Sequence, residues 1–258
     1  MSIGLDPIVV IGPLPIGWVT LFILAGLAIG GGLVLRWATP LGVGAGAVYG
    51  LVLQAVVWGL VGARLLHVLD YCSFYSEAPF QAMYVWIGGL SLWGGILGGV
   101  LGAGLYARRT GMPVWRLVDV AALAAVAGQA VARIGDVLTG ERLAKATSLP
   151  WGVTYTHPDS VSYTSELTQL HPVGLYELLW DAVLLVVLWR FRTRLRPDGA
   201  LFVAYLAGYA AGRFIISFAR LDPVLMLGLQ QAQVVGIAVL VTCGVLFWRW
   251  RGAFRRTS

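Results

Sequence analysis

The sequence is poor in charged residues, in cysteine and in residues that bind metals. Only 12% of its 258 residues are charged, whereas 59% are hydrophobic. A soluble domain of this length does not need so much apolar sequence. The composition therefore excludes a soluble domain and indicates an integral membrane protein. The two cysteines, Cys72 and Cys243, are too far apart in sequence to define a disulfide framework or a metal motif. His67 and His157 have no ligand-like neighbours at useful spacing, so we expect neither a metal nor a cofactor.

Seven apolar runs fill most of the chain. A membrane-spanning helix needs about 20 predominantly apolar residues, and each run approaches that length. The candidate spans are residues 16–35, 42–66, 85–106, 116–136, 174–190, 200–220 and 231–248. We therefore predict an all-α integral membrane protein with about seven transmembrane helices, and we expect residues 1–258 to form a single polytopic membrane domain.

Basic residues gather on alternate connections between these runs. They are Arg36, Arg108, Arg109, Arg116, Arg190, Arg192, Arg194, Arg196, Arg249, Arg251, Arg255 and Arg256. The positive-inside rule makes that side cytoplasmic, with the N-terminus outside and the C-terminus inside. The net charge of +6 therefore reflects membrane topology, and we expect no nucleic-acid partner. The connection 138–172 then faces outward, and its length suggests that it covers a site.

The end of the fourth run carries Arg133, Asp136 and Glu141, with Gly135 and Gly140 between them. Charges at this depth commonly cost about 2.5–3.5 kcal/mol each on insertion scales, so they usually face a protein interior and carry function. Arg133 and Asp136 are three residues apart, which places them on one helix face. Two interpretations stay open: a structural ion pair that ties the helix end to a loop, or an anion site in which Arg133 holds a phosphate bidentately.

Two more arginines, Arg213 and Arg220, are seven residues apart in the sixth run, so we expect them on one helix face together with Ser217. Arg220 either binds a ligand or snorkels to the interface, whereas the deeper position of Arg213 favours function. Both arginines, like Arg133 and Glu141, lie toward the predicted outer side. The two arginines and Arg133 run against the positive-inside bias, which indicates a local task.

The fifth run opens near His171 and contains Glu177 and, one turn later, Asp181. An unpaired carboxylate inside a span is costly, so Glu177 needs a cation partner such as Arg133 or Arg213. The spacing leaves open whether Glu177 is catalytic or orients another group. Arginine does not deprotonate at accessible pH, so three spans that deliver arginines or carboxylates to one side indicate a lipid-phosphate site rather than a proton path.

The third run is rich in glycine, and Gly94, Gly98 and Gly102 keep a spacing that allows close helix packing. A second interpretation is that Gly94 and Gly95 let backbone N–H groups reach an anionic headgroup. Arg64, near the end of the second run, is a further candidate phosphate ligand.

Several short motifs follow one another along nearly the whole chain. They are Asp6-Pro7 with Ile11-Gly12-Pro13 and Trp18; Gly88-Gly89-Leu90-Ser91 with Gly94-Gly95 and Arg108-Arg109; Arg133-Ile134-Gly135 with Gly140-Glu141; Pro150-Trp151-Gly152-Val153; His171-Pro172 with Tyr176-Glu177; and Gly212-Arg213-Phe214 with Arg220 and Asp222-Pro223. In this order they resemble the motifs of the prolipoprotein diacylglyceryl transferases. The resemblance implies a multi-pass enzyme of the bacterial cytoplasmic (inner) membrane, which moves diacylglyceryl from phosphatidylglycerol to the thiol of a lipobox cysteine.

The chain departs from the family pattern at a few polar positions. Val19 replaces a tyrosine, Ile87 an acid, Trp93 a histidine regarded as catalytic, Asp136 and Thr139 two asparagines, and Ser217 a glutamate. The arginines of the pattern are retained. The resemblance therefore supports the fold and the lipid-phosphate site more strongly than it supports the reaction.

We hypothesise that Arg133 and Arg213 hold the phosphate of an anionic phospholipid, phosphatidylglycerol or a similar one, and stabilise the glycerol-phosphate leaving group. With Trp93 in place of histidine, the candidate bases are Asp136 and Glu141, and pairing with Arg133 would make Asp136 the poorer proton acceptor. The expected partners are this lipid, a prolipoprotein signal peptide with its lipobox cysteine, and the membrane. The other residues assigned to substrate binding are Arg64, Trp93, Gly94, Gly95, Gly135, His171, Tyr176, Glu177 and Arg220.

Three alternatives differ in class. The chain could be a divergent transferase of the same fold that uses another acceptor or lipid. It could also be a non-catalytic phospholipid-binding relative in which Trp93 fills the space of the histidine. The third alternative is a glycine-packed scaffold or transporter with structural arginines.

Overall fold

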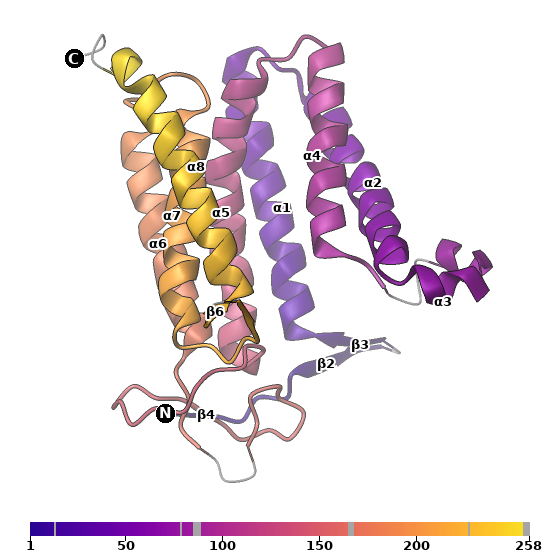
Figure 1. Cartoon of the computed structure of the whole chain (residues 1–258), viewed down its shortest axis with the longest axis vertical. Coiled ribbons are helices and arrows are strands. Elements are labelled where there is room, and N and C mark those ends of the chain that lie inside the picture. Colours follow the sequence, from indigo (N-terminus) through magenta and orange to yellow (C-terminus); the bar gives the residue numbers. More distant parts are fainter. Residues whose placement is uncertain (13, 78, 85–88, 165–167, 227, 255–258) are drawn as a thin grey trace. The chain divides into compact units, whose positions relative to one another are not determined.

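The computed structural model describes residues 1–12, 14–77, 79–84, 89–164, 168–226 and 228–254 (Figure 1). Within these residues, seven long helices coincide with the seven predicted runs. They are α1 (Trp18–Ala38), α2 (Ala45–Asp70), α4 (Leu92–Arg109), α5 (Val114–Thr139), α6 (Val173–Phe191), α7 (Ala200–Ser217) and α8 (Gln231–Phe254). Shorter helical segments are α3 (Cys72–Glu77) and two 3-10 turns, η1 (Thr39–Leu41) and η2 (Pro79–Met83). The prediction of a mostly helical protein is confirmed.

Five of the described helical segments are long and apolar enough to cross a membrane, which supports a multi-pass membrane protein. They are Trp18–Leu41, Ala45–Asp70, Val114–Thr139, Ala200–Ser217 and Gln231–Arg251. Helix α6 falls outside this set, since Glu177, Asp181 and Arg190 interrupt its apolar run. Helix α4 is also outside it, with its many glycines and two terminal arginines. The count of seven spans and the orientation of the termini stay predictions.

The third predicted span begins later than expected. Helix α4 starts at Leu92, because Gly89 has a left-handed backbone (φ 74°) and the residues before Leu92 bond to α2. Arg64 Nη1 donates to the Gly89 carbonyl at 2.9 Å, and the Ser91 amide donates to the Ala63 carbonyl at 2.9 Å. These bonds replace those of a helical turn. The predictions that concern Ile87, Gly88, Arg255 and Arg256 lie outside the described residues.

The sixth predicted span ends earlier than expected. Helix α7 stops at Ser217, and the Arg220 amide closes a turn onto the Ser217 carbonyl at 3.1 Å. Arg220 then forms a β-bridge with Ala144. The prediction that Arg213 and Arg220 share one helix face is therefore wrong, because Arg220 belongs to the chain that leaves the helix.

Three short strand pairs, which the sequence patterns did not predict, flank the helices (Figure 1). β1 (Ser2–Ile3) pairs in parallel with β4 (Thr154–Tyr155). β2 (Ile8–Ile11) and β3 (Leu14–Gly17) form an antiparallel hairpin just before α1, and β5 (Val224–Met226) pairs with β6 (Leu229–Gln230) between α7 and α8. Strand β4 lies in the long connection between α5 and α6, so the segment before α1 ties down that connection.

The chain divides into two compact units, and the prediction of a single domain stays a prediction. Unit 2 is Val34–Leu117, in which α2 and α4 pack closely along their glycines. A Cβ added at Gly94 or Gly98 would overlap the backbone of α2 at Gly62 or Trp58. The packing interpretation of this glycine spacing is therefore confirmed.

Unit 1 comprises Met1–Leu33 and Val118–Ser258 and contains most of α1 and α5 together with α6, α7 and α8. Helices α1 and α5 approach each other at Gly26 and Gly128, where a Cβ on either glycine would overlap the other's backbone. Helices α6 and α7 meet through Trp180, whose indole donates to the Gly208 carbonyl at 2.9 Å. These contacts fix the helices that carry the charged residues described below.

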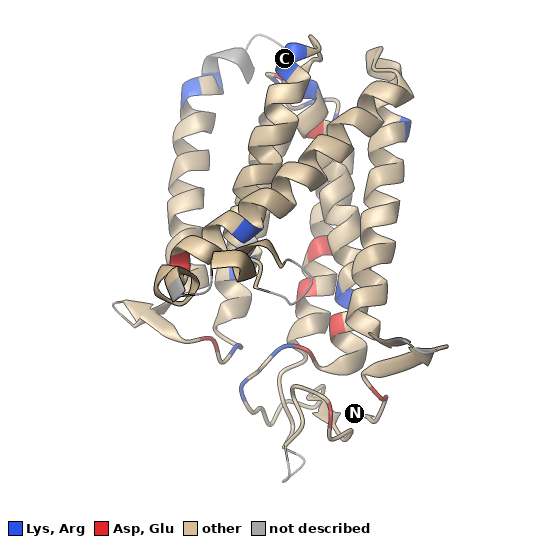
Figure 2. Ribbon diagram, turned by 90° about the vertical axis from the view of Figure 1, so that its right-hand side faces the viewer, with Lys and Arg blue, Asp and Glu red and all other residues tan. Residues whose placement is uncertain are grey.

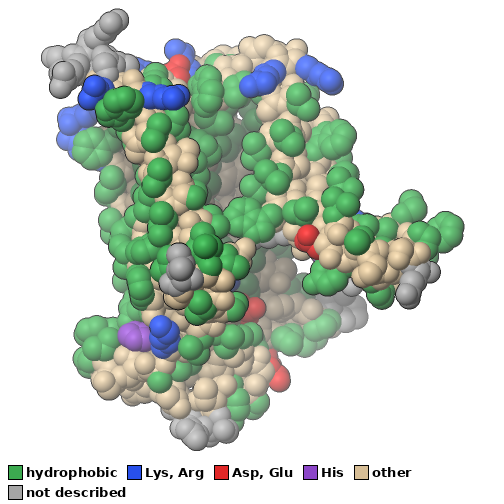
Figure 3. All heavy atoms as spheres, in the orientation of Figure 1, with side chains coloured by type: hydrophobic (Ala, Val, Ile, Leu, Met, Phe, Trp, Pro, Cys, Tyr) green, Lys and Arg blue, Asp and Glu red, His purple; other side chains and the backbone are tan. Residues whose placement is uncertain are grey.

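The surface of unit 1 matches a protein surrounded by lipid. Hydrophobic side chains cover the outer faces of its helices, and exposed examples include Leu179, Val183, Val186 and Val241 (Figure 3). Basic segments gather at the helix ends near the C-terminus (Figure 2). A soluble protein would bury more of these side chains, so the exposed apolar faces point to a membrane environment.

Candidate functional site

The end of α5 presents the first charged pair. Arg133 Nη1 lies 2.8 Å from Asp136 Oδ2, one turn along the helix. Gly135 packs against Val19 and Phe22 of α1, where an added Cβ would crowd both. Helix α5 ends at Thr139, directly before Gly140, which adopts a left-handed backbone (φ 66°).

Glu177 of α6 connects three arginines. Its Oε2 lies 3.0 Å from Arg133 Nη1, and its Oε1 lies 3.1 Å from Arg213 Nη1 and 3.4 Å from Arg220 Nη1. The Glu177 side chain is 6% exposed, so these charges are largely removed from solvent. The prediction that Glu177 pairs with Arg133 or Arg213 is confirmed, since it pairs with both.

Asp136 has a second cation partner that sequence reasoning missed. Arg142 Nε donates to Asp136 Oδ2 at 3.0 Å, from the first residues of the connection between α5 and α6. The sequence did contain a signal for this partner, because a basic residue directly after Glu141 also opposes the positive-inside bias. Asp136 therefore accepts hydrogen bonds from both Arg133 and Arg142.

Asp222, just beyond α7, completes the network and was assigned no role in the predicted site. Arg220 contacts both of its oxygens, at 2.8 and 3.1 Å, and Arg213 Nη2 contacts Oδ2 at 3.2 Å. Partial burial acts to raise the pKa of Asp222, but its hydrogen bonds to Arg220 and the charges of Arg220 and Arg213 outweigh burial and lower this pKa.

The network joins four arginines to four carboxylates, so its formal charges balance. The arginines are Arg133, Arg142, Arg213 and Arg220, and the carboxylates are Asp136, Glu177, Asp181 and Asp222. Several guanidinium N–H groups still have no partner among the described residues, including both terminal nitrogens of Arg142. Such groups can donate to an anion without breaking an existing pair.

Glu141, the other predicted base, does not join this network. It is exposed, and it forms no ion pair with any residue in the described ranges. It lies directly after Gly140, at the end of α5. No guanidinium among the described residues engages its carboxylate, which distinguishes Glu141 from Asp136.

The connection between α5 and α6 is held close to these helix ends. The Tyr155 hydroxyl donates to the Val137 carbonyl at 2.9 Å, and the Ser160 hydroxyl donates to the Thr139 carbonyl at 2.6 Å. Burial and the charge of Asp136 raise the pKa of Tyr155 to about 12, so this phenol stays protonated and keeps donating at neutral pH. These bonds hold this part of the connection against the end of α5, where Arg142 meets Asp136.

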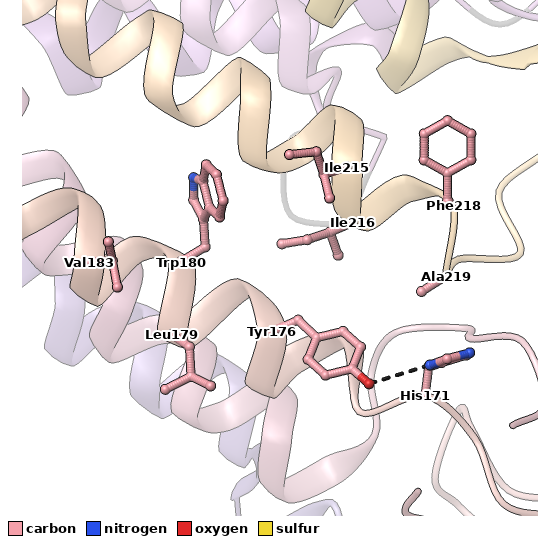
Figure 4. A pocket seen from close by; sticks show the side chains of 9 residues that line it. All are labelled: His171, Tyr176, Leu179, Trp180, Val183, Ile215, Ile216, Phe218 and Ala219. Atoms are coloured by element: carbon pink, nitrogen blue, oxygen red, sulfur yellow. Dashed lines mark hydrogen bonds between the residues drawn. The ribbon is translucent and has the colours of Figure 1, made fainter. Parts of the chain in front are cut away.

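His171 and Tyr176 line a separate cavity of about 670 Å³ between α6 and α7 (Figure 4). The Tyr176 hydroxyl lies 3.4 Å from His171 Nδ1 and accepts a hydrogen bond from the Trp151 indole at 2.8 Å. The other cavity walls are mainly apolar, with Trp180 and Phe218 among them. Both predicted residues therefore lie at the polar end of an apolar cavity rather than in the ion-pair network.

Four predicted residues belong to unit 2. Arg64 is buried, and its guanidinium donates to the carbonyls of Gln81, Ala82 and Gly89, so it ties α2 to the chain before α4. Trp93, in the first turn of α4, is 47% exposed. The other two are Gly94 and Gly95, both of which face α2. Their predicted binding roles stay predictions.

One group in the described part of the chain has the spacing of a metal site. The ligand atoms of Asp6, His157 and Asp159 all lie within 4.8 Å of one another. This corrects the expectation that His157 lacks ligand-like neighbours, because the fold brings Asp6 to it from the distant N-terminal segment. Asp6 and Asp159 are exposed, and such groups are common without an ion.

Comparison with known proteins supports the resemblance. The family model described as prolipoprotein diacylglyceryl transferase matches residues 7–250. The phosphatidylglycerol–prolipoprotein diacylglyceryl transferase of Synechococcus elongatus is 33% identical, over 97% of this chain and 88% of its own length. Proteins of the same name from Gloeobacter violaceus and Geobacillus kaustophilus are 35% and 34% identical, over 93% and 94% of this chain and 91% of each relative. The chain therefore belongs to the prolipoprotein diacylglyceryl transferase family.

Proposed function

We propose that this protein transfers a diacylglyceryl group from phosphatidylglycerol to the lipobox cysteine thiol of prolipoproteins and releases glycerol phosphate. It would do so in the bacterial cytoplasmic membrane, with seven spans and the ion-pair network toward the outer side. The curated relatives carry this activity in their names. The observation that supports it best is the pairing of Arg133 and Arg213 with the two oxygens of one carboxylate, Glu177.

A shared carboxylate brings the two guanidinium groups close enough to hold one phosphate between them. Arg133 comes from α5 and Arg213 from α7, and the 25% exposure of the Arg213 side chain leaves it accessible. Phosphate oxygens fit the planar donor fork of arginine, and a second guanidinium neutralises charge that develops on the leaving group. In this proposal Glu177 positions both arginines, and the phosphate accepts hydrogen bonds from N–H donors on their terminal nitrogens.

The bond changes follow from the chemistry of the two substrates. The cysteine thiol loses its proton to a base, and the thiolate attacks the carbon of the diacylglyceryl group that is bonded to the phosphate oxygen. The carbon–oxygen bond breaks, and its electron pair leaves with glycerol phosphate. We assign the base to Glu141, because Asp136 is engaged by Arg133 and Arg142.

The proposal is tested by turnover of phosphatidylglycerol and a lipobox peptide by the reconstituted protein. Arg133→Lys and Arg213→Lys keep the charge but lose bidentate binding, so we expect each to lower kcat/KM about 100- to 1,000-fold. Arg196→Lys is the matched control, since Arg196 is exposed in the connection between α6 and α7. The absence of thioether product from the wild-type protein, with phospholipid still bound, would overturn the reaction and favour a lipid-binding role.

The base is tested in the same assay with Glu141→Gln and Asp136→Asn. We expect Glu141→Gln to lower kcat about 100- to 10,000-fold with little change in thermal stability. Asp136→Asn removes the carboxylate charge that pairs with two arginines. Unlike Glu141→Gln, it should therefore lower thermal stability. Full activity of Glu141→Gln would exclude Glu141 as the base.

A further inference from the structure

A small polar pocket lies beside the network, between α6 and α7 and next to Arg133. Its free volume is about 10 Å³, which matches a single water-sized group. Its walls are Arg133, Glu177, Trp180, Asp181, Tyr209, Gly212, Arg213 and Ile216. Sequence reasoning assigned no role to Asp181 or Tyr209.

Three buried polar atoms of the pocket residues have no hydrogen-bond partner among the described residues. They are Arg133 Nε, Glu177 Oε2 and Asp181 Oδ2. The Asp181 side chain is 4% exposed, and its Oδ2 lies 3.8 Å from Arg133 Nε, which is too far for a hydrogen bond. Leaving charged groups unsatisfied in this way is costly, so the pocket is built to take a further polar group.

The three atoms define the chemistry of that group. Arg133 Nε can only donate a hydrogen bond, whereas the carboxylate oxygens of Asp181 and Glu177 can only accept one. A phosphate oxygen would be repelled by the two carboxylates, and an ammonium group could not accept from Arg133. A neutral hydroxyl accepts from Arg133 Nε and donates its one proton to Asp181 Oδ2, while Glu177 Oε2 keeps its ionic contact with Arg133 Nη1 at 3.0 Å.

We propose that this pocket is a hydroxyl subsite for the headgroup of the phospholipid, and that Asp181 is its specificity-determining residue. The inference rests on the proposed function, in which Arg133 and Arg213 hold the phosphate. Arg133 links the two sites, since its terminal nitrogen Nη1 contacts both Asp136 and Glu177 while its Nε lies nearest Asp181 Oδ2, at 3.8 Å. A headgroup with a hydroxyl a few bonds from its phosphate can occupy both at once.

The test compares phosphatidylglycerol with phosphatidylpropanol of the same acyl chains, which has the same phosphate charge but no headgroup hydroxyl. Binding to the purified full-length protein and turnover with a lipobox peptide are both measured. For the wild type we expect a preference for phosphatidylglycerol of about 10- to 100-fold, the range for a hydrogen bond to a charged group. Asp181→Leu should reduce the preference to near unity, and Asp181→Asn, which keeps one acceptor oxygen, should retain part of it.

Asp119→Asn is the matched control. Asp119 is a partly buried carboxylate of α5 that accepts from the Gly199 and Phe202 amides at 2.7 and 2.9 Å, away from the pocket. Its replacement should lower stability and leave the preference unchanged.

A wild-type preference near unity, or an equal loss for both lipids in Asp181→Leu, would overturn the subsite. Preferential binding without turnover would instead support the subsite and overturn the reaction. Failure to bind either lipid would overturn both proposals.

Discussion

Glu177 shows how one buried residue can organise a cluster of charged side chains. Its two carboxylate oxygens contact guanidinium groups from α5, from α7 and from the chain that follows α7. A lone carboxylate at this depth would be strongly disfavoured, and so would three neighbouring arginines without it. The residue therefore stabilises the fold and positions the arginines that we propose as phosphate ligands.

Glu177→Ala should lower the free energy of unfolding by about 3–5 kcal/mol, because it leaves Arg133, Arg213 and Arg220 with less compensating charge. Thermal unfolding in detergent measures the loss. Glu141→Ala is the matched control and should change stability by about 0.5 kcal/mol or less, since Glu141 is exposed and outside the network. Equal effects of the two variants would contradict the role of Glu177.

Asp222 should make stability depend on pH at acidic values. Its pKa is lowered in the folded protein by Arg220 and Arg213, below the value of about 3.9 that is typical of an unfolded chain. Such a group stabilises the fold above the unfolded pKa, and its contribution disappears as the pH falls through the folded pKa. The Tm difference between the wild type and Asp222→Asn should therefore shrink as the pH falls from about 5 to about 3. A difference that stays constant over this range would refute the argument.

At the scale of whole elements, α2 and α4 are held together by backbone contact rather than by large side chains. Gly62 and Gly94 oppose each other across the interface, and a methyl group on either would overlap the other helix. Close approach of this kind gains van der Waals contact that lipid cannot replace.

Gly94→Ala should destabilise the protein by about 1–3 kcal/mol through overpacking. Gly104→Ala, on the same helix with open space around it, should be neutral or stabilising by up to about 1 kcal/mol. Unfolding of the two variants in detergent gives the comparison. If Gly94→Ala lost phospholipid binding while keeping its stability, Gly94 would be a headgroup contact instead.

At the scale of the whole molecule, charge is distributed unevenly along unit 1. The connection between α6 and α7 is rich in arginine. The connection between α5 and α6 is the long one that contains Arg142. The positive-inside rule predicts that the first of these connections is cytoplasmic and that the second faces outward.

Cysteine labelling tests this orientation. In a variant with Cys72 and Cys243 replaced by serine, a membrane-impermeant maleimide should label Ser148→Cys in cells whose outer surface is accessible. It should label Thr193→Cys only after the membrane is permeabilised. Both positions are exposed, so burial does not limit either reaction. The reverse pattern would invert the predicted topology.

The sequence by itself determined the helices and the residues that would seek partners. Runs of about 20 apolar residues satisfy their own backbone only as helices in lipid, so each of the seven runs corresponds to a helix. The cost of unpaired charge in the same setting predicted the partners of Glu177. Both inferences depend on local composition and on the inability of lipid to solvate unpaired polar and charged groups.

Only the tertiary structure decided which distant residues meet and where the helices end. Arg142 and Asp222 join the network because the chain folds back after α5 and α7, and no sequence spacing encodes that return. Helix α4 begins at Leu92 because Arg64 binds the backbone before it, and Arg220 leaves α7 through a turn. These outcomes depend on contacts between segments far apart in sequence, which a local pattern cannot contain.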